Sequence, residues 1–158
     1  MKAQGYYQKA LELLPPADKK HRGQYLNSLG NSLRSAGFWS MILNTLGEDV
    51  LDDQVTRTGG ETTTRFLAEA VTAYREALTV RTKETLPQDW AMTQNNLGTV
   101  LRTQGWRTGD EAGKELTRQA ITAYELALQI ITRDALPVQW EETMRDITTA
   151  KKMLEDMK

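Results

Sequence analysis

The sequence predicts an all-α protein built from repeated helical hairpins, and three observations support that fold class. The chain matches itself when it is shifted by 50 residues. Apolar residues recur at helical spacing within the matched units, and no window of β-branched residues alternates with the period of two that a strand needs. A length of 158 residues with 39% hydrophobic residues is sufficient for one domain with a buried core, without any disulfide.

The 50-residue shift aligns two copies of one unit without a gap, and a weaker third copy precedes them. Arg57-Thr58-Gly59 matches Arg107-Thr108-Gly109, the segment 70–74 matches 120–124, and Leu86-Pro87 matches Leu136-Pro137. In the weaker copy, residues 27–30 echo residues 95–98 at an offset of 68, so 18 extra residues (68 − 50) lie between Gly37 and Arg57. We interpret this pattern as a duplicated structural unit with one insertion.

Each unit is predicted to contain two helices. In the first, Trp90, Gln94, Leu97 and Leu101 form one helical stripe. Leu86-Pro87 is expected to start this helix, because proline is favoured at the first helical position, and Gly105 is expected to end it.

The second helix of each unit carries a stripe of Leu67, Val71, Tyr74 and Leu78, and alanines beside it allow a neighbouring helix to approach closely. A capping-box pattern precedes this stripe in both copies, as Thr58-Gly59-Gly60-Glu61 and Thr108-Gly109-Asp110-Glu111. The pattern predicts either the start of the second helix or an ordered loop a few residues ahead of it.

We therefore expect one domain, residues 1–158, in four parts. They are a degenerate N-terminal repeat (1–37), an insertion (38–56), regular repeats (57–135) and a C-terminal cap (136–158). The last part keeps Trp140, Met144, Ile147 and Leu154 on one stripe but carries many charges elsewhere, as expected for a terminal helix with one face exposed to solvent. The N-terminal part begins with a second-type helix, which leaves an open face.

The segment from Leu86 to Gly98, Leu-Pro-Gln-Asp-Trp-Ala-Met-Thr-Gln-Asn-Asn-Leu-Gly, resembles the repeats of a bacterial tetratricopeptide-like class with long units. Kinesin light chain repeats are more distantly similar. The resemblance covers residues 57–158, and 1–37 more weakly; Gln94 departs from the family's tryptophan. It implies a right-handed α-α superhelix of helical hairpins that acts as a protein-binding scaffold, with the first helices lining a concave groove.

The resemblance also implies which residues face that groove: Asn27, Asn31 and Arg34 in the first copy, Asn95, Thr99 and Arg102 in the second, and Arg145 in the last. Asparagine amides can bond an extended peptide backbone, and arginine can bind a carboxylate through two parallel hydrogen bonds. We expect a protein or an acidic peptide as the partner. A solvated helix face remains the alternative for any one of these residues, and Asn95 can instead bond between successive helices.

The insertion is rich in apolar residues. It is predicted to be either an extended or extra helix that packs on the array, or a patch for self-association. In the second case a homo-oligomer would form through this patch and the open N-terminal face, and the patch would comprise Phe38, Trp39, Ile42, Leu43 and Leu46.

Other chemistries have little support in the sequence. With no cysteine and a net charge of −1, we expect no thiol chemistry, nucleic-acid binding or membrane binding, and the expected location is cytoplasmic. His21 lies in a charged run typical of a solvated surface, and the acidic residues between 48 and 53 lack the spacing of a calcium loop. Trp90 and Trp140 lie on apolar stripes, which indicates core positions. We expect no cofactor, no metal and no enzymatic activity.

Overall fold

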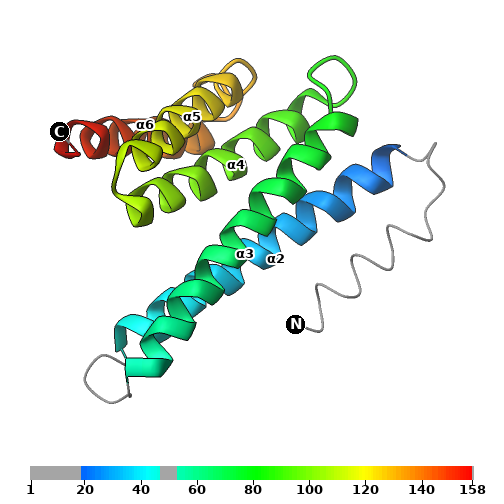
Figure 1. The fold of residues 1–158 in the computed structure, drawn as a ribbon. Coiled ribbons are helices and arrows are strands. Elements are labelled where there is room, and N and C mark those ends of the chain that lie inside the picture. The colour runs from blue at the N-terminus through cyan, green and yellow to red at the C-terminus, as the bar shows by residue number, and fades with distance from the viewer. Residues whose placement is uncertain (1–18, 47–52, 158) are drawn as a thin grey trace.

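The computed structural model describes the backbone of residues 19–46 and 53–157, and the side chains of residues 21–35 and 63–157. Within these ranges the chain is helical and contains no strand, so the predicted all-α class is confirmed (Figure 1). The helices are α2 (Lys19–Leu46), α3 (Asp53–Val80), α4 (Pro87–Thr108), α5 (Glu111–Ala127) and α6 (Pro137–Asp156).

The helices are arranged as successive neighbours. Helices α2 and α3 pack as one hairpin and α4 and α5 as a second, while α3 contacts α4 and α5 contacts α6 (Figure 1). Helix α4 also contacts α2 and α6. In the terms of the sequence repeat, α2, α4 and α6 are first-type helices, and α3 and α5 are second-type helices. The fold is therefore repeat-like, with each helix packing chiefly on those adjacent in sequence.

The two loops that connect second-type to first-type helices are nearly identical. Leu86 precedes α4 with φ −141° and ψ 64°, and Leu136 precedes α6 with φ −142° and ψ 66°. A proline follows each leucine at the start of the helix, as predicted. A cation also lies over a tryptophan ring in both loops: Lys83 over Trp90 at 6.0 Å and Arg133 over Trp140 at 5.7 Å. The 50-residue duplication therefore extends to local geometry.

Two buried tyrosines from the second-type helices fill the core at equivalent places. Tyr74 packs against Gly30 and Tyr124 against Gly98, and both tyrosine side chains are 0% exposed. The Tyr74 hydroxyl donates a hydrogen bond to Asn31 Oδ1 at 2.8 Å, and the equivalent Tyr124 hydroxyl donates to Thr99 Oγ1 at 3.3 Å. The glycines are required because a side chain there would occupy the space of the tyrosine ring.

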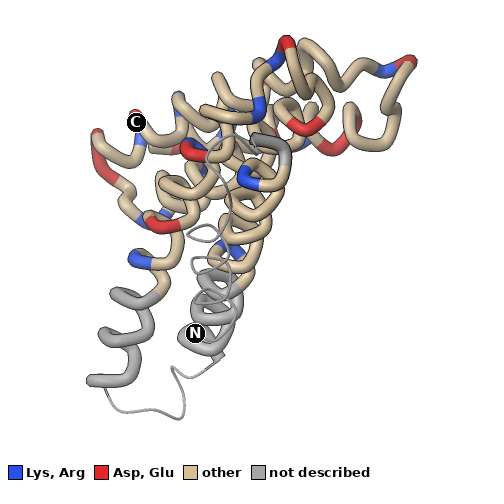
Figure 2. The backbone as a smooth tube through the Cα atoms, turned by 90° about the vertical axis from the view of Figure 1, so that its right-hand side faces the viewer, with Lys and Arg blue, Asp and Glu red and all other residues tan. Residues whose placement is uncertain are grey.

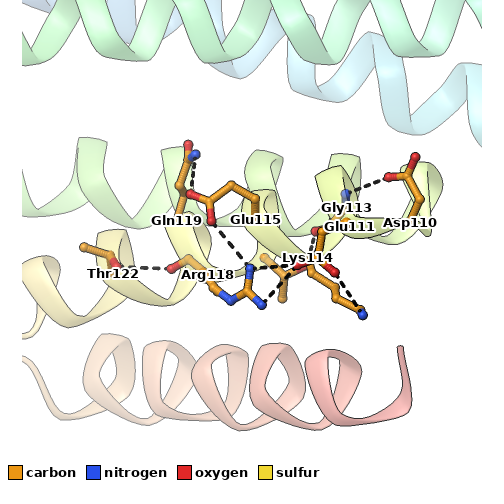
Figure 3. A network of polar contacts seen from close by, with 9 residues as sticks. Asp110, Glu111, Gly113, Lys114, Glu115, Arg118, Gln119 and Thr122 are labelled. Carbon is orange, nitrogen blue, oxygen red and sulfur yellow. Dashed lines mark hydrogen bonds and ion pairs between the residues drawn. The ribbon is translucent and has the colours of Figure 1, made fainter. Parts of the chain in front are cut away.

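The predicted capping boxes name the wrong cap residue in both copies, although α5 does begin within the second predicted segment. Helix α3 already begins at Asp53, so the backbone of residues 58–61 lies inside the helix rather than at its start. Before α5, the cap is Asp110, whose carboxylate accepts a hydrogen bond from the Gly113 N–H at 3.1 Å. Glu111, expected to bond back to the cap, instead forms an ion pair with Lys114 at 3.1 Å (Figure 3).

The predicted end of α4 at Gly105 is also wrong. The helix continues to Thr108 and ends at Gly109, which adopts the left-handed conformation with φ 71° and donates its N–H to the Gly105 carbonyl. Gly105 is buried, and a Cβ atom there would meet Thr117 and the Gly113 carbonyl. Its glycine therefore permits α4 and α5 to approach closely, and the next glycine terminates the helix.

The insertion chiefly lengthens two helices. Helix α2 continues to Leu46 and α3 begins at Asp53, as in the extended-helix interpretation, whereas residues 47–52 lie outside the described residues. The patch residues Phe38, Trp39, Ile42, Leu43 and Leu46 lie in the C-terminal part of α2, but their side chains fall outside the described ones, so the self-association prediction stays a prediction. Residues 1–18, with the expected open N-terminal face, also lie outside the description.

Candidate functional site

A cleft of about 1080 Å³ lies across the three first-type helices. Helices α2, α4 and α6 supply most of its wall, and Leu67 of α3 closes one side. Of the predicted groove residues, Arg34, Thr99 and Arg102 line the cleft. Arg145 does not line it and is exposed elsewhere on α6. The cleft is also lined by Thr103, Trp106, Thr149, Lys152, Met153, Asp156 and Met157.

Three cations occupy equivalent places on the three helices of the cleft. Arg34, Arg102 and Lys152 are related by the same offsets of 68 and 50 residues that define the sequence repeat, and all three line the cleft. We call them the cation row. Because equivalent residues occupy the same turn of equivalent helices, the row runs across the array rather than along one helix.

The central member of the cation row is partly neutralised. Arg102 Nη2 lies 3.4 Å from Asp146 Oδ1, and both side chains are partly exposed, at 25% and 30%. Burial raises the pKa of Asp146, and the positive charge of Arg102 acts in the opposite direction. The hydroxyl of Tyr124 lies beside this pair, and burial raises the pKa of that phenol as well.

In the described part of the chain, Arg34 forms no equivalent ion pair. Arg102 of α4 pairs with Asp146 of α6, the next first-type helix. On α4, which follows α2 and Arg34 in the same way, the residue equivalent to Asp146 is Asn96, an amide in place of the carboxylate. Among the described residues, no carboxylate lies within ion-pair distance of Arg34. Arg34 interacts with the hydroxyl of Tyr74, whose pKa burial raises to about 12 while Arg34 acts to lower it. Neither Arg34 nor Lys152 forms an ion pair with a carboxylate of the described residues, so both can bind an external carboxylate.

The asparagines predicted to face a ligand are engaged between helices. Asn27 Oδ1 accepts a hydrogen bond from the Thr93 hydroxyl at 3.2 Å, and Asn95 Oδ1 accepts the equivalent bond from Thr143 at 3.1 Å. Asn31 accepts from Tyr74. For Asn95 the structure shows the alternative stated above, a bond between successive helices.

An apolar region lies beside the cation row. Trp106 is 62% exposed, and Met153, Met157 and Leu67 line the same cleft. Sequence reasoning missed Trp106. The available signal was its position, because it falls off the apolar stripe formed by Trp90, Leu97 and Leu101, and an aromatic residue off the stripe is expected on the surface.

Charged groups elsewhere are structural or solvated. Arg81 is buried and donates to the Thr93 hydroxyl at 3.0 Å; burial lowers its pKa, and Asp89 acts in the opposite direction. On α5, Glu111 bonds Lys114 and Arg118 on an open surface, and the hydrogen bond from Lys114 is the main cause that lowers its pKa (Figure 3). Basic and acidic residues are interspersed along the described helices (Figure 2).

The described part of the chain holds neither a cluster of metal ligands nor a membrane-spanning helix. Residues 21–35 and 63–157 contain no group of three or more side chains suited to hold a metal ion. The acidic cluster between residues 48 and 53 lies outside the described side chains. His21 is exposed. None of the described helices has the length and hydropathy of a membrane span.

The fold and site together define an all-α, repeat-like helical protein with one large cleft described across its first-type helices. No protein-family model, curated protein or solved structure matches the chain.

Proposed function

We propose that the chain is a tetratricopeptide-like scaffold, a right-handed superhelix of hairpins that binds a protein or an acidic peptide in the cleft. The observation that carries the proposal is the cleft itself, in which an exposed tryptophan and two thioethers lie beside a row of three cations. Tryptophan and arginine are the residue types most enriched at the energetic centres of protein interfaces. The near-identical loops and tyrosine–glycine contacts of successive hairpins support the repeat assignment.

A random-peptide display library of 16 residues tests this function. We expect selection on the chain to enrich peptides whose affinity falls by about 10-fold or more when Trp106 is changed to alanine, because central aromatic side chains dominate binding energy. Met92→Ala is the matched control, since Met92 is 55% exposed and does not line the cleft. Peptides that bind all three proteins equally, or no enrichment at all, would contradict a peptide-binding cleft.

A second candidate is a self-associating module, favoured by the length of the α2–α3 hairpin. By the repeat alignment, the end of α4 at Thr108 corresponds to residue 40, yet α2 continues to Leu46. The α2–α3 hairpin therefore extends beyond the end of its α4–α5 counterpart, and this extension holds the apolar insertion. Sedimentation velocity over a range of concentrations tests this candidate, and a strict monomer at the highest concentration would exclude it.

A further inference from the structure

The threonine hydroxyls of the cleft already donate within their own helices, so few neutral hydrogen-bond donors remain for the backbone of a ligand. The hydroxyls of Thr99, Thr103 and Thr149 donate to carbonyls of their own helices at 3.2, 2.9 and 2.9 Å. The asparagines nearby are engaged between helices, as described above. The cleft therefore offers charge, apolar surface and hydroxyl oxygens, but its described walls hold no side-chain amide that could both donate to and accept from a peptide backbone.

This chemistry discriminates between ligand conformations. An extended peptide presents an N–H and a C=O at every residue, and groups buried without a partner are costly. An α-helix satisfies its own backbone and contacts a groove through side chains alone. A cleft without free amides on its walls thus favours a helix, which differs from the extended peptide that the sequence led us to expect.

The arrangement of side chains specifies which faces such a helix would have. The cation row crosses α2, α4 and α6, and the apolar region lies beside it because Trp106 follows Arg102 by one turn, roughly 6 Å along α4. Residues i and i+7 on one edge of a helix are roughly 10 Å apart, close to the usual 8–10 Å between packed helices. Acidic residues at that spacing can face successive members of the row, while residues at i+3 and i+4 face Trp106.

Charges near the row favour an acidic rather than a basic edge. Three cations line this level of the cleft, and Asp146 forms an ion pair with Arg102 and acts on Arg34 from beyond ion-pair distance. Asp156 is the one carboxylate among the described lining residues, and it lies a turn farther along α6, at the level of Trp106. The excess of positive charge is therefore concentrated at Arg34 and Lys152.

We propose that the cleft binds an amphipathic α-helix of a partner protein, acidic along one edge and apolar along the adjacent face. The proposal rests on the peptide-binding function above and specifies its ligand. The acidic edge lies on the cation row, with Arg34 and Lys152 as its main contacts, and the apolar face covers Trp106, Met153 and Met157.

The test uses two 16-residue display libraries, one fully random and one with proline fixed at its centre. We expect Trp106-dependent binders only from the first library, with Glu or Asp at i and i+7 and apolar residues between them. Far-UV circular dichroism should show a gain of helical signal on mixing. A central proline introduced into each binder should weaken binding by about 100-fold, because proline disrupts a helix interior.

Charge variants test the cation row. Arg34→Gln and Lys152→Gln should each weaken binding several-fold and reduce its dependence on salt. Arg118→Gln is the matched control, because Arg118 belongs to the open network on α5 and does not line this cleft. Equal affinity in Arg34→Gln, Arg118→Gln and the parent chain would overturn the assignment of the acidic edge.

The outcomes separate this proposal from the function on which it rests. Trp106-dependent binders that tolerate proline and gain no helical signal would overturn the helix while the peptide-binding cleft stands. Binders that ignore Trp106→Ala would overturn both. A concentration-dependent dimer that Trp106→Ala abolishes would assign the cleft to a second copy of the chain and overturn the partner helix.

Discussion

The contact between Gly98 and Tyr124 gives a quantitative test of how the repeats pack. A Cβ atom at Gly98 would lie 2.7 Å from Tyr124 Cε1, well inside van der Waals contact. The ring has little room to move, because it is 0% exposed and its hydroxyl is bonded to Thr99. Overpacking a core usually costs about 1–3 kcal/mol, whereas replacing glycine by alanine inside a helix gains roughly 1 kcal/mol.

We therefore expect Gly98→Ala to lower the free energy of unfolding by up to about 2 kcal/mol, or Tm by up to about 8 °C for a chain of this size. Urea and thermal denaturation followed by far-UV circular dichroism measure the change. Thr148→Ala is the control, because Thr148 is the exposed equivalent of Gly98 on α6 and its change should stay within about 0.5 kcal/mol. A Gly98→Ala protein more stable than the parent would refute the reasoning.

Three further predictions follow from single contacts. Asn95→Ala should lower the free energy of unfolding by up to about 1 kcal/mol, because it removes the bond between Asn95 and Thr143, whose buried hydroxyl keeps only the Gln139 carbonyl. Cleft binding should be unchanged, and binding lost at full stability would contradict this. The free energy of unfolding should fall between about pH 10 and 12, because folded Tyr74 keeps its proton up to a pKa of about 12 while the unfolded phenol releases it near 10. Urea titrations should show a smaller fall in Tyr74→Phe than in the parent chain, and equal falls would contradict the assignment. Gly109→Ala should cost about 1–2 kcal/mol in thermal denaturation, because φ is 71° there, and an unchanged Tm would show that the left-handed turn relaxes.

Much of the fold follows from the sequence because helical periodicity and proline chemistry are local. The stripe from Trp90 to Leu101 and the Leu-Pro starts each depend on residues within one helix, and the structure confirms both helices and starts. Helix ends were less accessible. Gly105 and Gly109 are both plausible terminators, and the choice between them depends on Thr117 of the neighbouring helix.

The candidate site was less predictable, because it depends on pairs of helices. A sequence pattern places Asn95 on a helix face, but only the structure shows that Thr143 of α6 faces it. The difference between Arg34 and Arg102 likewise depends on the next first-type helix. Asp146 of α6 pairs with Arg102, whereas the equivalent residue of α4 is Asn96. Trp106 could not be placed by the apolar stripe of its helix, because an exposed aromatic residue lies off that stripe.

The glycine contacts also explain why α6 differs from α4. Helix α5 packs against α4 at two glycines, where Tyr124 contacts Gly98 and Thr117 contacts Gly105. At the positions 50 residues later, α6 carries Thr148 and Glu155, and both are exposed. A second-type helix packed there would meet a β-branched side chain where the tyrosine ring belongs and a charge where the backbones approach. The surface of α6 thus supports the proposed capping role by a steric and electrostatic mechanism, and not merely by its higher content of charge.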